Sequence, residues 1–157
     1  MYKEVNGDLI QLAKEGNFDV IAHGCNCMCQ MGAGIAPQMV KAFGVNQYDL
    51  EQSYTRGDIN KLGQIEWYLE REGPIRYVVN AYTQYSYGRN HADGVSKPLD
   101  YDALTLCMRK INHRFKGLRI GLPQIGAGLA GGDWNRIKQI IQTELKDCDV
   151  TVVIYKK

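Results

Sequence analysis

Short apolar runs alternate with longer amphipathic stretches along this chain, and this pattern predicts strands and helices in turn. The predicted strands are rich in β-branched or aromatic residues and have turn residues at their flanks. They span Tyr2–Asn6, Val20–Gly24, Gly63–Leu69, Ile75–Ala81, Leu118–Leu122 and Thr151–Tyr155. The predicted helices carry apolar residues at helical spacing and span Ile35–Phe43, Gln47–Arg56, Asp100–Phe115 and Trp134–Asp147. Such alternation indicates an α/β sandwich with helices on both faces of a sheet.

Length and composition narrow the class of protein. A chain of 157 residues without a linker or repeat predicts one domain over residues 1–157. Its net charge of +2 is too small to indicate a nucleic-acid or membrane surface. No apolar run approaches the ~20 residues that a membrane span needs, and the first residues lack an apolar signal region. The five cysteines, an odd number, fit reduced thiols, so we expect a cytoplasmic protein.

Two glycine-rich segments each follow a predicted strand and precede a predicted helix. The first covers Cys25–Ala33, and the second is Pro-Gln-Ile-Gly-Ala-Gly-Leu-Ala-Gly-Gly-Asp at 123–133. Glycine lets the backbone approach an anion closely, and a helix start directs N–H groups toward it. Either segment alone could be an ordinary turn, but the pair favours a clamp on a diphosphate. Neither has Rossmann G-x-G-x-x-G or P-loop spacing, which disfavours nucleotide binding of those two kinds.

Five polar side chains stand near these segments, and four of them have two interpretations each. His23 could be structural or could act as a general acid, for which an ordinary imidazole pKa near 6.5 is suitable. Asn26 could bind a ribose hydroxyl. Asp8 could cap a turn or accept from an exocyclic amine, and Tyr155 could stack on a base or pack in the core. Asp133 could be a base, but we favour a helix cap.

Three cysteines, Cys25, Cys27 and Cys29, invite a metal interpretation. Structural zinc sites use C-x₂₋₄-C pairs, so C-x-C-x-C is too tight, and no second pair is evident. In an extended segment, alternation would put all three side chains on one side, as small packing residues. We therefore predict no metal site and no cofactor.

In order along the chain, five motifs resemble the macro domain family from about Val5 to Tyr155. They are Asn-Gly-Asp-Leu-Ile, Ala-His-Gly-Cys-Asn-Cys, Met-Gly-Ala-Gly-Ile-Ala, Pro-Gln-Ile-Gly-Ala-Gly-Leu-Ala-Gly-Gly-Asp-Trp and Val-Thr-Val-Val-Ile-Tyr. The resemblance implies a three-layer α/β/α sandwich around a mixed six-stranded sheet, with an ADP-ribose cleft at its top. It implies that Asp8 takes the adenine amine, that Asn26 reaches the distal ribose and that both glycine loops hold the diphosphate. The implied ligand-binding residues are Asp8, Leu9, Asn26, Gly32, Ala33, Gly34, Ile35, Gln124, Ile125, Gly126, Ala127, Gly128, Leu129 and Tyr155.

The segment His-x-Cys-Asn-Cys is similar to compact macro domains that remove the phosphate from ADP-ribose 1″-phosphate. This likeness implies a phosphatase, with His23, Asn26 and Asp133 as catalytic candidates. Another compact branch removes ADP-ribose from acidic side chains, with a lysine after the middle strand and an aspartate directly after Gly-x-Gly-Leu. This chain departs from that pattern, with Tyr-Thr-Gln at 82–84 and Ala130 at those places.

Three functions therefore stay open: a phosphatase, a non-catalytic ADP-ribose-binding module, and a hydrolase that removes ADP-ribose from modified proteins by other residues. The expected partners are ADP-ribose, ADP-ribose 1″-phosphate or an ADP-ribosylated protein. No nucleic-acid or membrane partner is expected.

Overall fold

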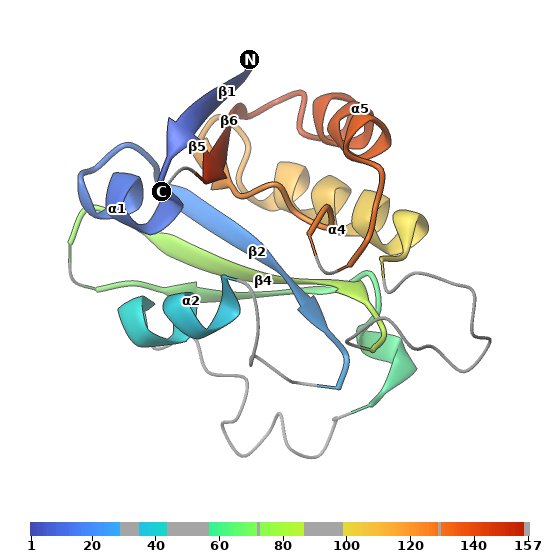
Figure 1. The fold of residues 1–157 in the computed structure, drawn as a ribbon. Helices are drawn as coiled ribbons and strands as arrows, with labels where there is room; N and C mark the ends of the chain where they lie inside the picture. The colour runs from blue at the N-terminus through green and yellow to red at the C-terminus, as the bar shows by residue number, and fades with distance from the viewer. Residues whose placement is uncertain (29–34, 44–56, 72, 87–98, 129, 156–157) are drawn as a thin grey trace.

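A computed structural model describes residues 1–28, 35–43, 57–71, 73–86, 99–128 and 130–155. Its strands are β1 (Tyr2–Gly7), β2 (Val20–Asn26), β3 (Ile65–Leu69), β4 (Tyr77–Gln84), β5 (Arg119–Leu122) and β6 (Asp149–Tyr155). The α-helices are α1 (Leu9–Lys14), α2 (Ala36–Phe43), α4 (Tyr101–Arg114) and α5 (Trp134–Glu144), and the 3-10 helix η1 covers Ile59–Lys61 (Figure 1).

The strands form one mixed sheet in the order β1-β6-β5-β2-β4-β3. All neighbouring strands are parallel except β3, which runs antiparallel to β4. The mixed six-stranded sheet that the family resemblance implied is thereby confirmed. After β2 the chain builds one side of the sheet with β3 and β4, and later the other side with β5 and β6. The carboxyl ends of β2 and β5 therefore meet at a topological switch point, where open α/β sheets bind ligands.

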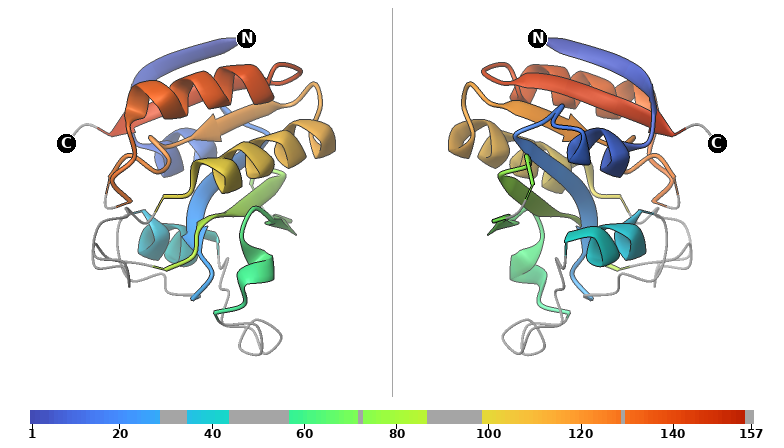
Figure 2. Two further views of the ribbon diagram at one scale, coloured as in Figure 1. Left: turned by 90° about the vertical axis from the view of Figure 1, so that its right-hand side faces the viewer. Right: turned by 90° about the vertical axis from the view of Figure 1, so that its left-hand side faces the viewer.

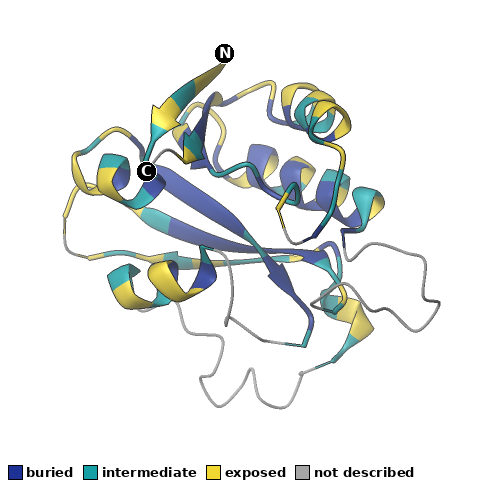
Figure 3. Cartoon of the chain, viewed as in Figure 1, coloured by how far each residue is buried: buried dark blue, intermediate teal, exposed yellow. Residues whose placement is uncertain are grey.

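Alternating side chains on the central strands supply both faces of the sheet with apolar residues. On one face, Ile21 and Val78 pack with residues of α1 and α2. On the other face, Val20 and Val79 pack with residues of α4 and α5. Figure 2 shows these two helical layers on opposite sides of the sheet, and Figure 3 shows the central strands as its most buried part. The predicted three-layer sandwich is therefore confirmed.

Two central strands are longer than the apolar runs that predicted them. β2 continues past Gly24 to Asn26, and β4 continues past Ala81 to Gln84. Their pairing goes on across an irregularity between Cys25 and Asn26, which brings Asn26 opposite Gln84. The extension includes the buried residues Cys25 and Tyr82, but the polar residues Asn26, Thr83 and Gln84 interrupt the apolar pattern there. The segment from Cys25 was therefore wrongly assigned to a loop as a whole.

Helix α1 was not predicted. Its six residues are too few for a clear helical period, and its one signal is the N-cap Asp8, whose side chain accepts from the Gln11 N–H. Asp100 caps α4 as predicted, and α5 ends at Glu144 rather than at Asp147. The predicted helix Gln47–Arg56 lies outside the described residues.

Within the described ranges, the helices are all too short or too polar to cross a membrane.

The packing of Phe18 on β5 makes a stability prediction. Phe18 is buried, and a Cβ added at Gly121 would lie 2.6 Å from its Cδ2 atom. Gly121→Ala should therefore lower the free energy of unfolding by about 1–3 kcal/mol, as overpacked cores do. Urea unfolding measures the change. Gly128→Ala is the matched control, because a Cβ there meets no heavy atom within 4 Å. Equal stabilities of the two variants would contradict this account of the contact.

Candidate functional site

A cavity of about 330 Å³ lies at the carboxyl ends of β1, β5 and β6. The starts of α1 and α2 complete its wall. Five residues that the sequence assigned to a ligand meet there, although they come from four separate segments of the chain. They are Asp8, Leu9, Ile35, Gln124 and Tyr155, and Gly7, Gln38, Pro123 and Val153 complete the lining.

Asp8 stands at the point where β1 ends and α1 begins. Its Oδ1 atom accepts the Gln11 N–H at 3.1 Å, so one carboxylate oxygen caps the helix. Among the described residues Oδ2 has no hydrogen-bond donor, which leaves it able to accept from a group in the cavity. Leu9 is buried beside it, whereas Tyr155 is 61% exposed at the end of β6. The capping interpretation of Asp8 is thus confirmed, and it leaves room for the ligand-binding one.

The second glycine loop follows β5 and is fixed by a buried side chain and by backbone hydrogen bonds. Ile125 is buried, and its N–H donates to the Pro123 carbonyl at 2.7 Å. The Ala127 N–H donates to the Gln124 carbonyl at 3.2 Å. By contrast, the N–H groups of Gly126 and Gly128 have no acceptor within the described part of the chain. Such unsatisfied donors beside a helix start are what an anion needs. Leu129 lies outside the described residues.

The first glycine loop is described only at its flanks. Gly32, Ala33 and Gly34 lie outside the described residues, so their predicted contact with a diphosphate stays a prediction. Ile35 lines the cavity, and its carbonyl accepts from the Met39 N–H at the start of α2.

His23 lies in the interior of β2 with no exposed surface. It pairs with Asn80 across the β2–β4 ladder, and its Nε2 lies 2.6 Å from Asn80 Oδ1. Since an amide oxygen only accepts, this contact assigns the proton to Nε2. Burial lowers the pKa of His23 to about 4, and the Asn80 contact opposes that shift only in part. The ring is therefore neutral near pH 7.

This environment argues against His23 as a general acid. A general acid needs a proton to give and a path to the ligand, and the described geometry provides neither. The structural interpretation of His23 is the one that its surroundings support. Asn80 itself was missed in the sequence, although its amide interrupts an apolar run, Tyr-Val-Val-Asn-Ala, directly opposite His23.

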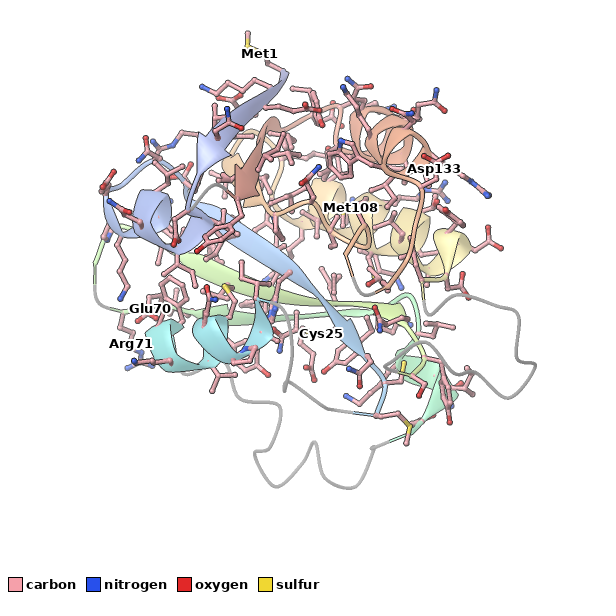
Figure 4. All side chains as sticks on the ribbon, in the orientation of Figure 1. Met1, Cys25, Glu70, Arg71, Met108 and Asp133 are labelled. Carbon is pink, nitrogen blue, oxygen red and sulfur yellow. The ribbon has the colours of Figure 1, made fainter. Side chains whose placement is uncertain are left out.

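Asn26 and Asp133 occupy different parts of the molecule. Asn26 ends β2 and is buried. Asp133 caps α5: its Oδ1 accepts the Asn135 N–H at 3.0 Å, and its own N–H donates to the Tyr101 hydroxyl of α4 at 2.8 Å. Figure 4 labels it at the start of α5. The favoured interpretation as a cap is confirmed, and Asp133 is not one of the residues that line the cavity.

The cysteines of the first loop pack in a small cluster. Cys25 and Cys27 are buried with Ala36 and Tyr82, as their one-sided alternation predicted. Cys29 lies outside the described residues. Over the described ranges, no three His, Cys, Asp or Glu side chains converge on a point where a metal could bind.

Comparisons with known proteins agree with this architecture. The family model of the Macro domain matches residues 22–141. An uncharacterized 17.5 kDa protein from the tk-vs intergenic region of Enterobacteria phage T4 is 34% identical over 157 residues, which cover 96% of this chain and 94% of that protein. The Homo sapiens ADP-ribose glycohydrolase OARD1 is 27% identical, over 96% of this chain and 88% of that protein.

A solved structure is similar over the whole chain. The macrodomain of Thermus aquaticus DarG has a TM-score of 0.70 at 25% identity, and the match covers 100% of this chain and 99% of that one. The family model spans well over half of the residues, and the match includes β5 and most of β2. This chain therefore belongs to the Macro domain family.

Proposed function

We propose that this protein binds ADP-ribose, and that it hydrolyses the terminal phosphate of ADP-ribose 1″-phosphate. The observation that carries the binding proposal is the cavity at the ends of β1, β5 and β6, where five predicted ligand residues meet. Its volume of about 330 Å³ is at the lower end of the usual range for ligand sites, roughly 300–1,000 Å³. A cavity of this size suits the adenosine half of ADP-ribose.

The adenosine half would use both polar and apolar parts of the lining. Oδ2 of Asp8 would accept the N6 amine of adenine, while Oδ1 keeps its cap on α1. Leu9, Ile35 and Val153 would supply apolar walls. The exposed ring of Tyr155 would cover one face of the base.

The diphosphate would rest on backbone donors. The N–H groups of Gly126 and Gly128 have no acceptor among the described residues, and Ile125 anchors their loop in the core. Because β5 lies beside β2 in the sheet, the start of this loop lies near the end of β2. Preorganised amides of this kind stabilise negative charge without reorganisation. The distal ribose and its 1″-phosphate would then extend toward Asn26 at the end of β2.

In the proposed reaction, a water oxygen attacks phosphorus, the bond between phosphorus and the 1″-oxygen breaks, and inorganic phosphate leaves. The 1″-oxygen takes a proton and becomes the anomeric hydroxyl of ADP-ribose. Asn26 would position the phosphate, and solvent would supply the protons, since His23 is neutral and buried. Positioning without a general acid forgoes a factor of roughly 10²–10⁴ in rate, so we expect slow turnover.

Removal of ADP-ribose from proteins is the second candidate. The human relative that carries the name ADP-ribose glycohydrolase favours it. Against it stand Ala130 directly after the Gly-x-Gly-Leu segment and Tyr-Thr-Gln at the exit of β4, because the resembled branch uses an aspartate and a lysine at these places. Lys97, the lysine that follows this exit in sequence, lies outside the described residues.

The function is tested with three ligands in parallel. We expect ADP-ribose to bind in calorimetry, and phosphate to be released from ADP-ribose 1″-phosphate. Release of ADP-ribose from a protein modified on glutamate should stay at the level of a blank. Binding without either release would leave a binding module, and release from the modified protein alone would select the glycohydrolase.

Asp8 gives a sharper test of the binding mode. Asp8→Ala should weaken ADP-ribose binding by about tenfold to a hundredfold, the worth of one charge-assisted hydrogen bond of roughly 1.5–3 kcal/mol. Asp8→Ser keeps a residue that can cap α1 and should lose as much affinity. Asp100→Ala is the matched control, since Asp100 caps α4 through the Ala103 N–H but lies outside the cavity lining. Equal affinity of Asp8→Ser and the unmodified protein would remove Asp8 from the site.

His23 should act through stability and not through proton transfer. Its pKa falls from 6.5 to about 4 on folding. Below about pH 6.5, His23 is therefore protonated in the unfolded chain while it is still neutral in the folded one. Above that pH both states bind the same number of protons at His23, and the free energy of unfolding is unaffected. Between roughly pH 7 and pH 4.5, proton binding to the unfolded chain lowers the free energy of unfolding by about 2.5 kcal/mol. Urea unfolding at these two values should show a smaller difference for His23→Gln.

The same variant separates the two roles of His23. Phosphate release per folded molecule should stay near that of the unmodified protein. Loss of a general acid or base usually lowers the rate by roughly 10²–10⁴-fold. A loss of that size in the variant would show that His23 takes part in the reaction.

A further inference from the structure

The two edges of the sheet differ in what they expose. β1 forms one edge, and its exposed residues include the charged Lys3 and Glu4, which discourage pairing with another strand. β3 forms the other edge, and it exposes large apolar side chains: Trp67 is 41% and Leu69 is 56% exposed. An edge of the second kind is one to which another strand can add.

The backbone of β3 offers hydrogen-bonding groups along this edge. The Tyr82 N–H donates to the Gln64 carbonyl at 3.0 Å, and the Glu70 N–H donates to the Arg76 carbonyl at 2.8 Å. Even-numbered residues therefore face β4. By the alternation of an antiparallel pair, the N–H and C=O groups of residues 65, 67 and 69 face the open edge. Within the described ranges these outward groups have no hydrogen-bond partner.

Helix α4 adds a basic and apolar stripe beside the edge. Leu106, which is 41% exposed, Lys110 and Arg114 follow one another at i, i+4 spacing. The Arg114 guanidinium lies 4.3 Å from the centre of the Trp67 ring. Lys110 Nζ donates to the Gly63 carbonyl and to Gln64 Oε1, both at 2.8 Å, which ties the helix to the start of β3. We call Trp67, Leu69, Leu106, Lys110 and Arg114 the β3 edge surface.

We propose that the β3 edge surface binds an extended polypeptide segment that presents apolar and acidic side chains toward α4. The outward backbone groups would pair with the segment, since added strands gain affinity from main-chain hydrogen bonds and specificity from alternate side chains. Apolar side chains would cover Trp67 and Leu69. Carboxylates of the segment would form ion pairs with Lys110 and Arg114, the two charged residues of this surface, which are both cations.

Charge also decides against a second copy of this chain as the partner. A twofold dimer through β3 would place the same surface of both copies face to face. Lys110 and Arg114 of each copy would then meet their own counterparts. Like charges brought together across an interface suppress the wrong partner, so the occupant is a different, acidic segment.

The test uses a defined probe on the full chain. The probe is a blocked eight-residue peptide, Thr-Val-Thr-Glu-Thr-Val-Thr-Glu, whose valines and glutamates share one face of a strand. Titrated into ¹⁵N-labelled protein, it should shift the amide signals of Ile65, Trp67 and Leu69 and the indole signal of Trp67. The same peptide with lysine for glutamate should bind at least about tenfold more weakly.

Two N-methylated forms of the peptide test the backbone pairing. One is methylated on the threonines and the other on the valines and glutamates. Alternate N–H groups of a strand face the same side, so edge pairing predicts that one form loses binding and the other keeps it. Equal loss with both forms, or no shift at the three amides at millimolar peptide, would overturn the proposal.

Charge-reversal variants test the contribution of α4. Arg114→Glu should weaken binding of the glutamate peptide by about tenfold or more. Lys116→Glu makes the same charge change on an exposed residue outside the surface and should change it little. Both variants should bind ADP-ribose as the unmodified protein does. Equal effects of the two reversals, or a concentration-dependent dimer that protects the same three amides, would contradict the proposed partner.

Discussion

The pairing of β2 on both edges and its burial on both faces is the constraint on which the rest of the structure depends. β4 and β5 are parallel to it, so three strands end together at the switch point. Both glycine loops start from these ends. The position of β2 in the sheet therefore brings the starting points of the two loops close together. The same burial leaves no water for polar groups on β2, so any polar side chain there must find a partner in the protein.

His23 and Asn80 show how that requirement is met. They sit opposite one another on adjacent strands, and the amide oxygen takes the imidazole proton. Nδ1 of His23 and Nδ2 of Asn80 are left without a hydrogen bond. Each unmet group has a cost of roughly 1–3 kcal/mol, and protonation of the ring would add a buried charge. Burial therefore holds His23 in its neutral form, although the contact with Asn80 opposes the lowering of its pKa in part. A histidine beside a ligand loop invites a catalytic interpretation, and burial on both faces of the sheet is the physical reason that this one does not support it.

The sequence predicted the elements that are apolar and repetitive. Each of the six strands was located, because β-branched runs between turns mark buried strands, and the sides of the sheet followed from alternation. It could not predict α1, which has six residues, or the last residues of β2 and β4, where polar residues interrupt the apolar runs. In the site, the family resemblance assigned five of the nine residues that line the cavity to the ligand, and the other four were not named as such. Asn80, the partner of His23, was not predicted, because the register between β2 and β4 cannot be read from a single sequence.

The glycines of the second loop differ in the physical reason that requires glycine at each position. Gly126 has a φ of +79°, which disfavours other residues, and a Cβ there would also lie 2.9 Å from Leu99 Cδ1. Gly132 is likewise closed off, because Leu99 and Ile137 occupy the space that a Cβ would need. Gly128 has neither limit, because no described heavy atom lies within 4 Å of the place that a Cβ would take. Leu99 and the Asp133 cap thus set the shape of the loop from the side of α4 and α5. The described part of the protein gives no steric reason for glycine at position 128, and the proposed approach of a diphosphate to this loop would give one.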